Sequence, residues 1–230
     1  METTTAPAMR LRSDEALLRL FRADTLSPKE VGGLLDNMDH EERVLAVRAL
    51  GRKQQSALWT AVDGLAPVTL LDIVPQTRAT DEEVRHFGKN SLPMFTHFEK
   101  RFLRPAGQDA AHPEELHGYN YQASAVSTWF SGPGYFVATE DKARGEVLID
   151  YRRVPDSHPP NWPEIRGNER GGASLVYGFM VDTLRHVSAH VTIGRANKRG
   201  KDMDAWFLLC RDASDAVKPA VKATPSIQQV

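Results

Sequence analysis

The sequence predicts a mixed α+β fold, in which an N-terminal module of short helices is followed by an antiparallel sheet with helices packed on it. Up to residue 65, helix-start signals recur, each followed by apolar residues at helical spacing. After residue 120, several segments alternate apolar and polar residues as half-buried strands do. The chain of 230 residues is 41% hydrophobic, enough to bury a core without disulfides.

The helical module is predicted from two capping boxes. Ser27-Pro28-Lys29-Glu30 combines a capping hydroxyl, a proline at the first helical position and a glutamate three residues after the cap. Asp39-His-Glu-Glu42 repeats this arrangement. We therefore expect short helices over residues 13–64, forming a unit for packing or partner binding.

Residues 66–80 read as a connector around a short apolar run. The sequence Thr80-Asp-Glu-Glu83 then predicts a longer helix to about residue 102, kinked at Pro93. On such a helix His86 and His97 share a face but stand about three turns apart, too far to bind one metal ion together.

The second half of the chain predicts strands at residues 121–130, 135–139 and 146–152. A long proline-containing loop follows at 153–172, and then a helix with apolar residues from 175 to 187. Alternation over residues 189–193 and 205–209, on either side of Asn197-Lys-Arg-Gly200, predicts a β-hairpin. The expected organisation is a helical module at 1–65, an α/β ligand-binding-like domain at 66–212 and a flexible tail at 213–230.

This order of elements, together with Gly178-Phe-Met-Val-Asp-Thr-Leu184 and Trp206-Phe-Leu-Leu, resembles a known family over about residues 66–212. The family is the 4-vinyl-reductase-type small-molecule-binding domain, in the superfamily of heme nitric-oxide-binding-like sensors. Myxobacterial paralogous domains of similar size are the most alike. The resemblance implies an α/β domain that encloses an apolar pocket, is often dimeric, and senses or scaffolds rather than catalyses.

The resemblance does not extend to the cofactors of that superfamily. Zinc-binding members use several cysteines near the final hairpin, whereas Cys210 is the one cysteine of this chain. Heme-binding members carry a Tyr-x-Ser-x-Arg signature, which Tyr119-Asn-Tyr-Gln-Ala-Ser-Ala does not match. We therefore expect no cofactor and no metal.

Aromatic and methionine side chains are the candidate ligand-binding residues, because they could line an apolar pocket or equally fill a solid core. They are Phe95, Phe98, Trp129, Phe136, Phe179 and Met180.

No catalytic motif is complete in this sequence. His190-Val-Thr192 matches half of a two-histidine phosphoesterase signature, and no second copy occurs. An enzyme site assembled from His190, Asp150 and Tyr151 would require these residues to converge in one cleft.

Composition limits the partners and the compartment. With 29 basic and 30 acidic residues, the chain has a net charge near zero, so long-range electrostatic attraction would not recruit nucleic acid or an anionic membrane. One cysteine, no secretory signal and no long apolar run favour the cytoplasm.

The preferred hypothesis is a non-enzymatic regulatory or scaffolding protein with a domain for an apolar small molecule. The alternatives are a protein-interaction subunit acting through the helical module, with a partner or self-association, and an enzyme with a site around His190.

Overall fold

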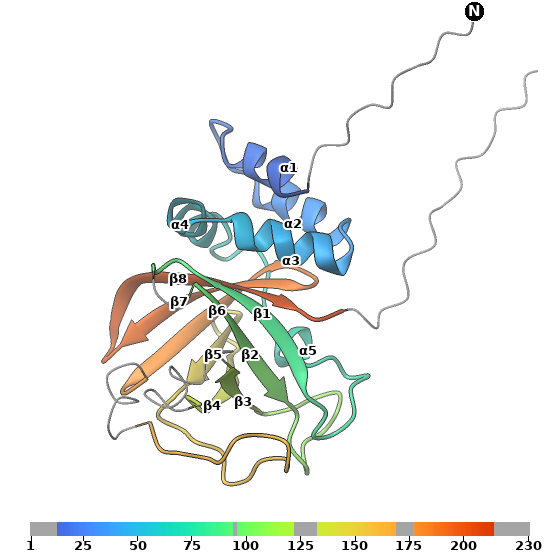
Figure 1. Ribbon diagram of the computed structural model, residues 1–230, viewed down its shortest axis with the longest axis vertical. Helices are drawn as coiled ribbons and strands as arrows, with labels where there is room; N and C mark the ends of the chain where they lie inside the picture. The colour runs from blue at the N-terminus through green and yellow to red at the C-terminus, as the bar shows by residue number, and fades with distance from the viewer. Residues whose placement is uncertain (1–12, 94–95, 122–132, 169–176, 214–230) are drawn as a thin grey trace, which may run out of the picture.

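The protein folds as a closed barrel of antiparallel strands with a layer of helices over one side (Figure 1). The computed structural model describes residues 13–93, 96–121, 133–168 and 177–213. Each strand pairs with the next along the chain, and the last pairs with the first. The strands are β1 (Val84–Asn90), β2 (His97–Leu103), β3 (Leu116–Tyr121), β4 (Phe136–Asp141), β5 (Glu146–Asp150), β6 (Met180–Ser188), β7 (Val191–Lys198) and β8 (Lys201–Arg211).

The predicted α+β fold, a sheet with packed helices, is wrong. The chain after residue 80 forms a closed barrel, and the described residues of this part contain no helix. One short helix, α5 (Leu70–Ile73), lies between the four helices of the N-terminal module and the first strand. Two segments predicted as helices are strands, and each has a specific physical reason.

The kinked helix predicted from residue 80 is the hairpin β1–β2. Phe87 lies opposite Cys210 on the outer face of the barrel, whereas Phe98 and Phe102 face the interior. Because both faces of the hairpin carry phenylalanines, their spacing imitates a helical stripe. Asp81 adopts a left-handed φ of 60°, so the chain turns where a helix was expected to begin. His86 faces the interior and His97 is exposed on the outside, so the two histidines do not share a face.

The late helix predicted over residues 175–187 is strand β6 from Met180 onward. Leu184 belongs to the cluster inside the barrel, and Val187 belongs to the cluster under the helices. A strand buried on both faces loses its alternating pattern, and its apolar residues then fit a helical period as well.

The predicted hairpin at 189–209 is confirmed as β7 and β8. Lys198 pairs with Lys201, so Arg199 and Gly200 form the two-residue turn, with φ of 55° and 75°. Two successive left-handed residues are typical of the type I′ turn that matches the twist of paired strands.

The predicted N-terminal helices are also present: α1 (Ser13–Leu20), α2 (Pro28–Asp36), α3 (His40–Ala49) and α4 (Arg52–Ala61). Ser27 Oγ accepts a hydrogen bond from the Glu30 backbone, and Asp39 forms its capping box with Glu42. The helices cover the outer face of β6, β7 and β8, where their apolar residues share one cluster with Val191, Ile193 and Leu208. The predicted tail lies, apart from Ala213, outside the described residues.

Two adjacent glycines of α2 test this helix–barrel contact. A Cβ on Gly32 would lie 2.6 Å from the Val187 backbone oxygen, whereas a Cβ on Gly33 would meet nothing within 4 Å. We expect Gly32→Ala to lower the free energy of unfolding by about 1–3 kcal/mol through overpacking. Gly33→Ala should raise it by up to about 1 kcal/mol, because alanine favours the helix. Urea denaturation of both variants measures this, and equal effects would contradict the close contact.

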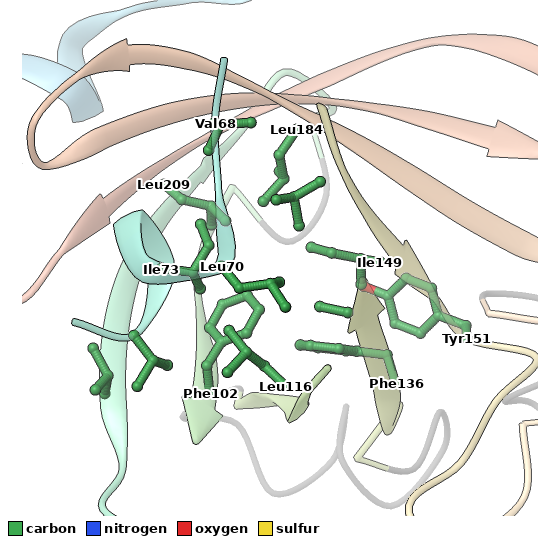
Figure 2. Packing of buried hydrophobic residues seen from close by; sticks show 14 of the residues in the cluster. Val68, Leu70, Ile73, Phe102, Leu116, Phe136, Ile149, Tyr151, Leu184 and Leu209 are labelled. Atoms are coloured by element: carbon green, nitrogen blue, oxygen red, sulfur yellow. The ribbon is translucent and has the colours of Figure 1, made fainter. Parts of the chain in front are cut away.

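One end of the barrel is filled by part of the segment predicted as a connector, residues 66–80. Helix α5 brings Leu70 and Ile73 against Phe102 and Leu116 inside the barrel (Figure 2). We call α5 the plug of the barrel. Glu140, near the end of β4, accepts a hydrogen bond from the Leu70 backbone at 2.8 Å, which holds the plug in place.

Three glycines let phenylalanine rings cross the interior. Gly88, Gly118 and Gly194 stand directly opposite a phenylalanine of the neighbouring strand, and a Cβ on any of them would lie 2.6 Å or less from that ring. Each ring fills the space that a side chain at its glycine would otherwise take. The pairs are Gly88–Phe98, Gly118–Phe136 and Gly194–Phe207.

Candidate functional site

A cluster of polar side chains lies inside the otherwise apolar barrel. In the strand register His86, Lys100 and Asn120 are neighbours on β1, β2 and β3, and their side chains are all buried. Asp182 on β6 and Tyr151, just after β5, reach the same point from the opposite wall. We call Lys100, Asn120, Tyr151 and Asp182 the Lys100 cluster.

Lys100 is the centre of this cluster. Its Nζ donates hydrogen bonds to Asn120 Oδ1 at 2.9 Å, to Asp182 Oδ2 at 3.3 Å and to the Tyr151 hydroxyl. The Tyr151 hydroxyl in turn donates to Asp182 Oδ2 at 3.3 Å, and Asn120 Nδ2 donates to the Gly134 carbonyl at 3.2 Å. All three protons of the ammonium group therefore have acceptors.

Aromatic rings surround the same nitrogen. The centroids of the Tyr151, Phe207, Phe136 and Phe98 rings lie 4.9, 5.0, 5.2 and 5.8 Å from Nζ. Tyr177 stacks on Tyr151 at 5.2 Å with an interplanar angle of 17°. These rings exclude water and favour a cation at Nζ, so they partly replace the hydration that Lys100 loses on burial.

Burial shifts the titration of all three ionisable groups in the cluster. Loss of hydration lowers the pKa of Lys100, and the nearby Asp182 opposes that shift. Loss of hydration also raises the pKa of Asp182 above its usual value, against the attraction of Lys100. Burial and the Asp182 carboxylate keep the pKa of Tyr151 well above 10, so its phenol stays protonated.

Asp182 has one oxygen that the cluster does not use. Its Oδ2 accepts hydrogen bonds from Lys100 and Tyr151, whereas Oδ1 is buried and has no partner among the described residues. Buried polar atoms are nearly always hydrogen-bonded in proteins, so an orphaned carboxylate oxygen calls for an explanation. It is the one acceptor of the cluster that is open to a further donor.

The cluster lies midway along the barrel. Phe102, two residues from Lys100 on β2, packs with α5 at the plugged end, and Phe98, two residues the other way, is only half-buried. Met180, at the start of β6, is half-buried against the same core. The cluster is therefore nearer to solvent at the end of the barrel that carries the β1–β2 and β7–β8 turns, opposite α5.

Of the predicted ligand-binding residues, Phe98 and Phe136 contact the centre of the cluster, and Met180 packs on the same core. Phe179 is 49% exposed outside it, with a left-handed φ of 60° and the Arg199 guanidinium 5.1 Å from its ring. Phe95 and Trp129 lie outside the described residues.

Sequence reasoning missed Lys100, Asn120 and Asp182. The available signal is Phe98-x-Lys100-x-Phe102, which places a charge in the middle of an apolar strand face once the segment is read with period two. A helical reading hides this signal, because it removes Lys100 from the phenylalanine stripe.

The hypothetical enzyme site of His190, Asp150 and Tyr151 does not assemble. Asp150 pairs with Val181 at one end of β6, whereas His190 follows Ser188 at the other end, about 23 Å away along the strand. Asp150 binds Arg152 at 2.8 Å, away from Tyr151. His190 lines a surface hollow of about 360 Å³ together with two basic and two acidic residues, Arg78, Arg211, Glu82 and Asp212.

His86 is a second buried titratable group and gives the protein an acid sensitivity. Its Nε2 lies 3.0 Å from the Ile73 carbonyl, and burial lowers its pKa to about 3. In the unfolded chain this histidine has a pKa of 6.5, so on acidification it takes up a proton before the folded protein does. The stability that depends on neutral His86 is therefore fully present above pH 6.5 and is lost as the pH falls toward 3.

We expect the protein to lose about 2 kcal/mol of unfolding free energy between pH 7 and pH 5 through His86. His86→Gln keeps a donor for the Ile73 carbonyl and removes the titration, so it should flatten this loss. Urea denaturation at the two pH values checks it. His112→Gln, at an exposed position, serves as the control and should leave the slope unchanged. An unchanged slope in His86→Gln would contradict the assignment.

Comparison with family models, with curated proteins and with solved structures finds no match for this chain. The resemblance to the 4-vinyl-reductase-type domain thus remains untested, although the kinked helix on which it partly rested is a hairpin. None of the described helices has the length and apolar character required to cross a membrane. In the described part of the chain, histidine, cysteine and acidic residues form no group of three suited to a metal ion.

Proposed function

We propose that the barrel binds a small molecule at the Lys100 cluster, and that the protein is a regulatory or scaffolding component rather than an enzyme. The observation that carries the proposal is the orphaned Asp182 Oδ1. A buried acceptor left without a hydrogen bond costs about 1–3 kcal/mol. A ligand that donates a hydrogen bond to this oxygen would remove that cost.

The energetics of the ion pair support a role other than stability. Lys100 and Asp182 are 2% and 3% exposed. Removing such a pair from water costs several kcal/mol per ion, and apolar replacements of buried pairs are often neutral or stabilising. The surrounding interior is apolar, so a leucine and a methionine would suit it. Buried titratable groups with shifted pKa values cluster at functional sites.

The chemistry of the cluster selects the class of ligand. One cation and one anion leave no net charge, so an anionic ligand meets Asp182 and a cationic ligand meets Lys100. The aromatic rings around Nζ favour an apolar or aromatic body. The interior of an eight-stranded barrel holds side chains or one small ligand. We infer a neutral compound with an aromatic body and one hydrogen-bond donor, held mainly by burial.

The proposal retains the cytoplasm as the compartment and a protein partner or self-association as the output. Cys210 is the one cysteine of the chain, so no disulfide can form within it, which fits a reducing compartment. It is fully buried beneath the helices, and burial raises its pKa to about 12. An inert, buried thiol needs no oxidising compartment.

Native mass spectrometry and thermal shift measurements test ligand binding. We expect p-cresol and p-toluidine to raise the melting temperature, and p-methylanisole, which has no donor, to raise it less, because the hydrogen bond to Asp182 Oδ1 is lost. A co-purified neutral small molecule in the native spectrum would agree. The proposal fails if none of these compounds, and no co-purified one, binds the protein.

Two variants locate the ligand. Lys100→Met/Asp182→Leu replaces the ion pair by apolar residues and should remove the difference between p-cresol and p-methylanisole. Lys142→Met changes an exposed lysine on the opposite side of the plug and should keep that difference. If the difference between p-cresol and p-methylanisole is the same in both variants, the ligand binds elsewhere.

A further inference from the structure

We propose that Lys100 captures aldehydes or ketones by forming a reversible imine through its Nζ. This inference rests on the proposed function, because the carbonyl compound must enter the barrel interior. It names the reactive class among the ligands, namely carbonyl compounds with an aromatic or apolar body.

Geometry is the first argument. Nζ is held between an acid–base group and aromatic rings, rather than at the end of a mobile side chain. Asp182 Oδ2 and the Tyr151 hydroxyl both contact Nζ and lie 3.3 Å from each other. A carbonyl carbon that approaches Nζ would thus find a proton donor and a proton acceptor beside its oxygen. Imine formation requires such a donor and acceptor at the attacking nitrogen.

The charge state is the second argument. An ammonium group has no lone pair, so the amine must be neutral to attack a carbonyl. Lys100 and Asp182 rest as an ion pair, but burial lowers the pKa of Lys100 and raises that of Asp182, so transfer of one proton from Nζ to Asp182, which gives the neutral amine and the neutral acid, costs less here than in water. A desolvated lysine in an apolar pocket is a known form of activated nucleophile.

The step balances in atoms and protons. The Nζ lone pair forms a C–N bond as the Asp182 proton moves to the carbonyl oxygen, which gives a carbinolamine. The nitrogen returns a proton to Asp182, which passes it to the carbinolamine hydroxyl. That hydroxyl leaves as water when the C=N bond forms, so one water is released and no net proton is consumed. The Tyr151 phenol orients Nζ and stays protonated throughout.

The surroundings of Lys100 would also favour the imine once it has formed. Hydrolysis of an imine requires water, and the rings of Phe98, Phe136 and Phe207 exclude it from Nζ. Exposed lysines such as Lys142 and Lys201 lack this shielding. Selective reaction at Lys100 is therefore the feature that distinguishes a built site from ordinary amine chemistry.

Reductive trapping tests the inference in the full chain at pH 7. Benzaldehyde with sodium cyanoborohydride converts an imine into a stable benzylamine, which intact mass and peptide mapping then locate. We expect Lys100 to be labelled before Lys142, since each unit of pKa lowering gives about a tenfold larger fraction of free amine. Asp182→Asn keeps the shape but removes both the proton relay and the carboxylate that raises the pKa of Lys100. Labelling of Lys100 should slow despite the larger fraction of free amine, because the relay is lost, and labelling of Lys142 should be unaffected.

Benzyl alcohol separates this inference from the function on which it rests. It is close in size and shape to benzaldehyde and has a donor but no carbonyl group, so it reports non-covalent binding alone. Binding of benzyl alcohol without labelling of Lys100 overturns covalent capture and leaves the proposed function standing. Failure of both overturns both. The wild-type peptide map needs no variant, so the result does not depend on whether a Lys100 variant folds.

Discussion

Replacing Asp182 by leucine is expected to destabilise the protein by about 3–5 kcal/mol, because removal of one partner leaves a buried charge without its counterion. Lys100 would retain Asn120 and Tyr151 as acceptors but would lose its only carboxylate partner among the described residues. Lys100→Met should have an effect of similar size through the uncompensated Asp182. Chemical denaturation followed by tryptophan fluorescence measures both variants.

The double variant Lys100→Met/Asp182→Leu decides how the effect is interpreted. It leaves no buried charge in the cluster, so we expect it to be more stable than either single variant. In that case the ion pair is not needed for the fold, and its presence calls for a functional explanation. If the destabilisation of the double variant equals the sum of those of the two single variants, this expectation is contradicted and the ion pair has a structural role.

The helices before residue 65 could be predicted because their signals are local. Ser27 and Asp39 form their caps with residues three positions away, and neither contact depends on the barrel. The turn at Arg199 and Gly200 could be predicted for the same reason, since a two-residue turn is set by its own backbone conformation.

The barrel itself could not be predicted because its strands are buried on both sides where the helices cover it. Phe87 faces the helical layer while Phe102 faces the core, so apolar residues lie on both faces of the hairpin. The alternation of apolar and polar residues that marks a strand is therefore lost. Tertiary packing overrode the capping signal at Thr80, where Glu83 pairs with Arg101 on the neighbouring strand at 3.1 Å. A carboxylate at this spacing fits a helix start and a cross-strand ion pair equally well.

The candidate site is still less visible in the sequence, because Lys100 and Asp182 are 82 residues apart and meet only when the barrel closes. Nothing local marks Asp182, which stands within an apolar segment that resembles a helix. Phe136 and Met180 could be named in advance because aromatic and methionine residues are expected in any core or pocket. The charged residues were missed because their pairing is a long-range property of the fold.

Gly118→Ala is expected to lower the free energy of unfolding by about 3 kcal/mol, at the upper end of overpacking effects. A Cβ there would lie 2.3 Å from the Phe136 ring and 2.6 Å from the Arg101 backbone oxygen. The ring is fully buried and the oxygen belongs to the paired strand β2, so neither can move without opening the barrel.

The other two glycines of the interior provide a graded control. The three atoms nearest to a Cβ on Gly194 all belong to the Phe207 ring, and those nearest to a Cβ on Gly88 all belong to the half-buried Phe98 ring, so the cost should fall from Gly118 to Gly194 to Gly88. Shrinking the ring should rescue Gly194→Ala in the double variant with Phe207→Leu. The corresponding change of Phe136 should rescue Gly118→Ala only in part, because the contact with the Arg101 oxygen remains. Equal rescue at both positions would show that ring contact alone, and not the closeness of the two backbones, requires glycine at 118.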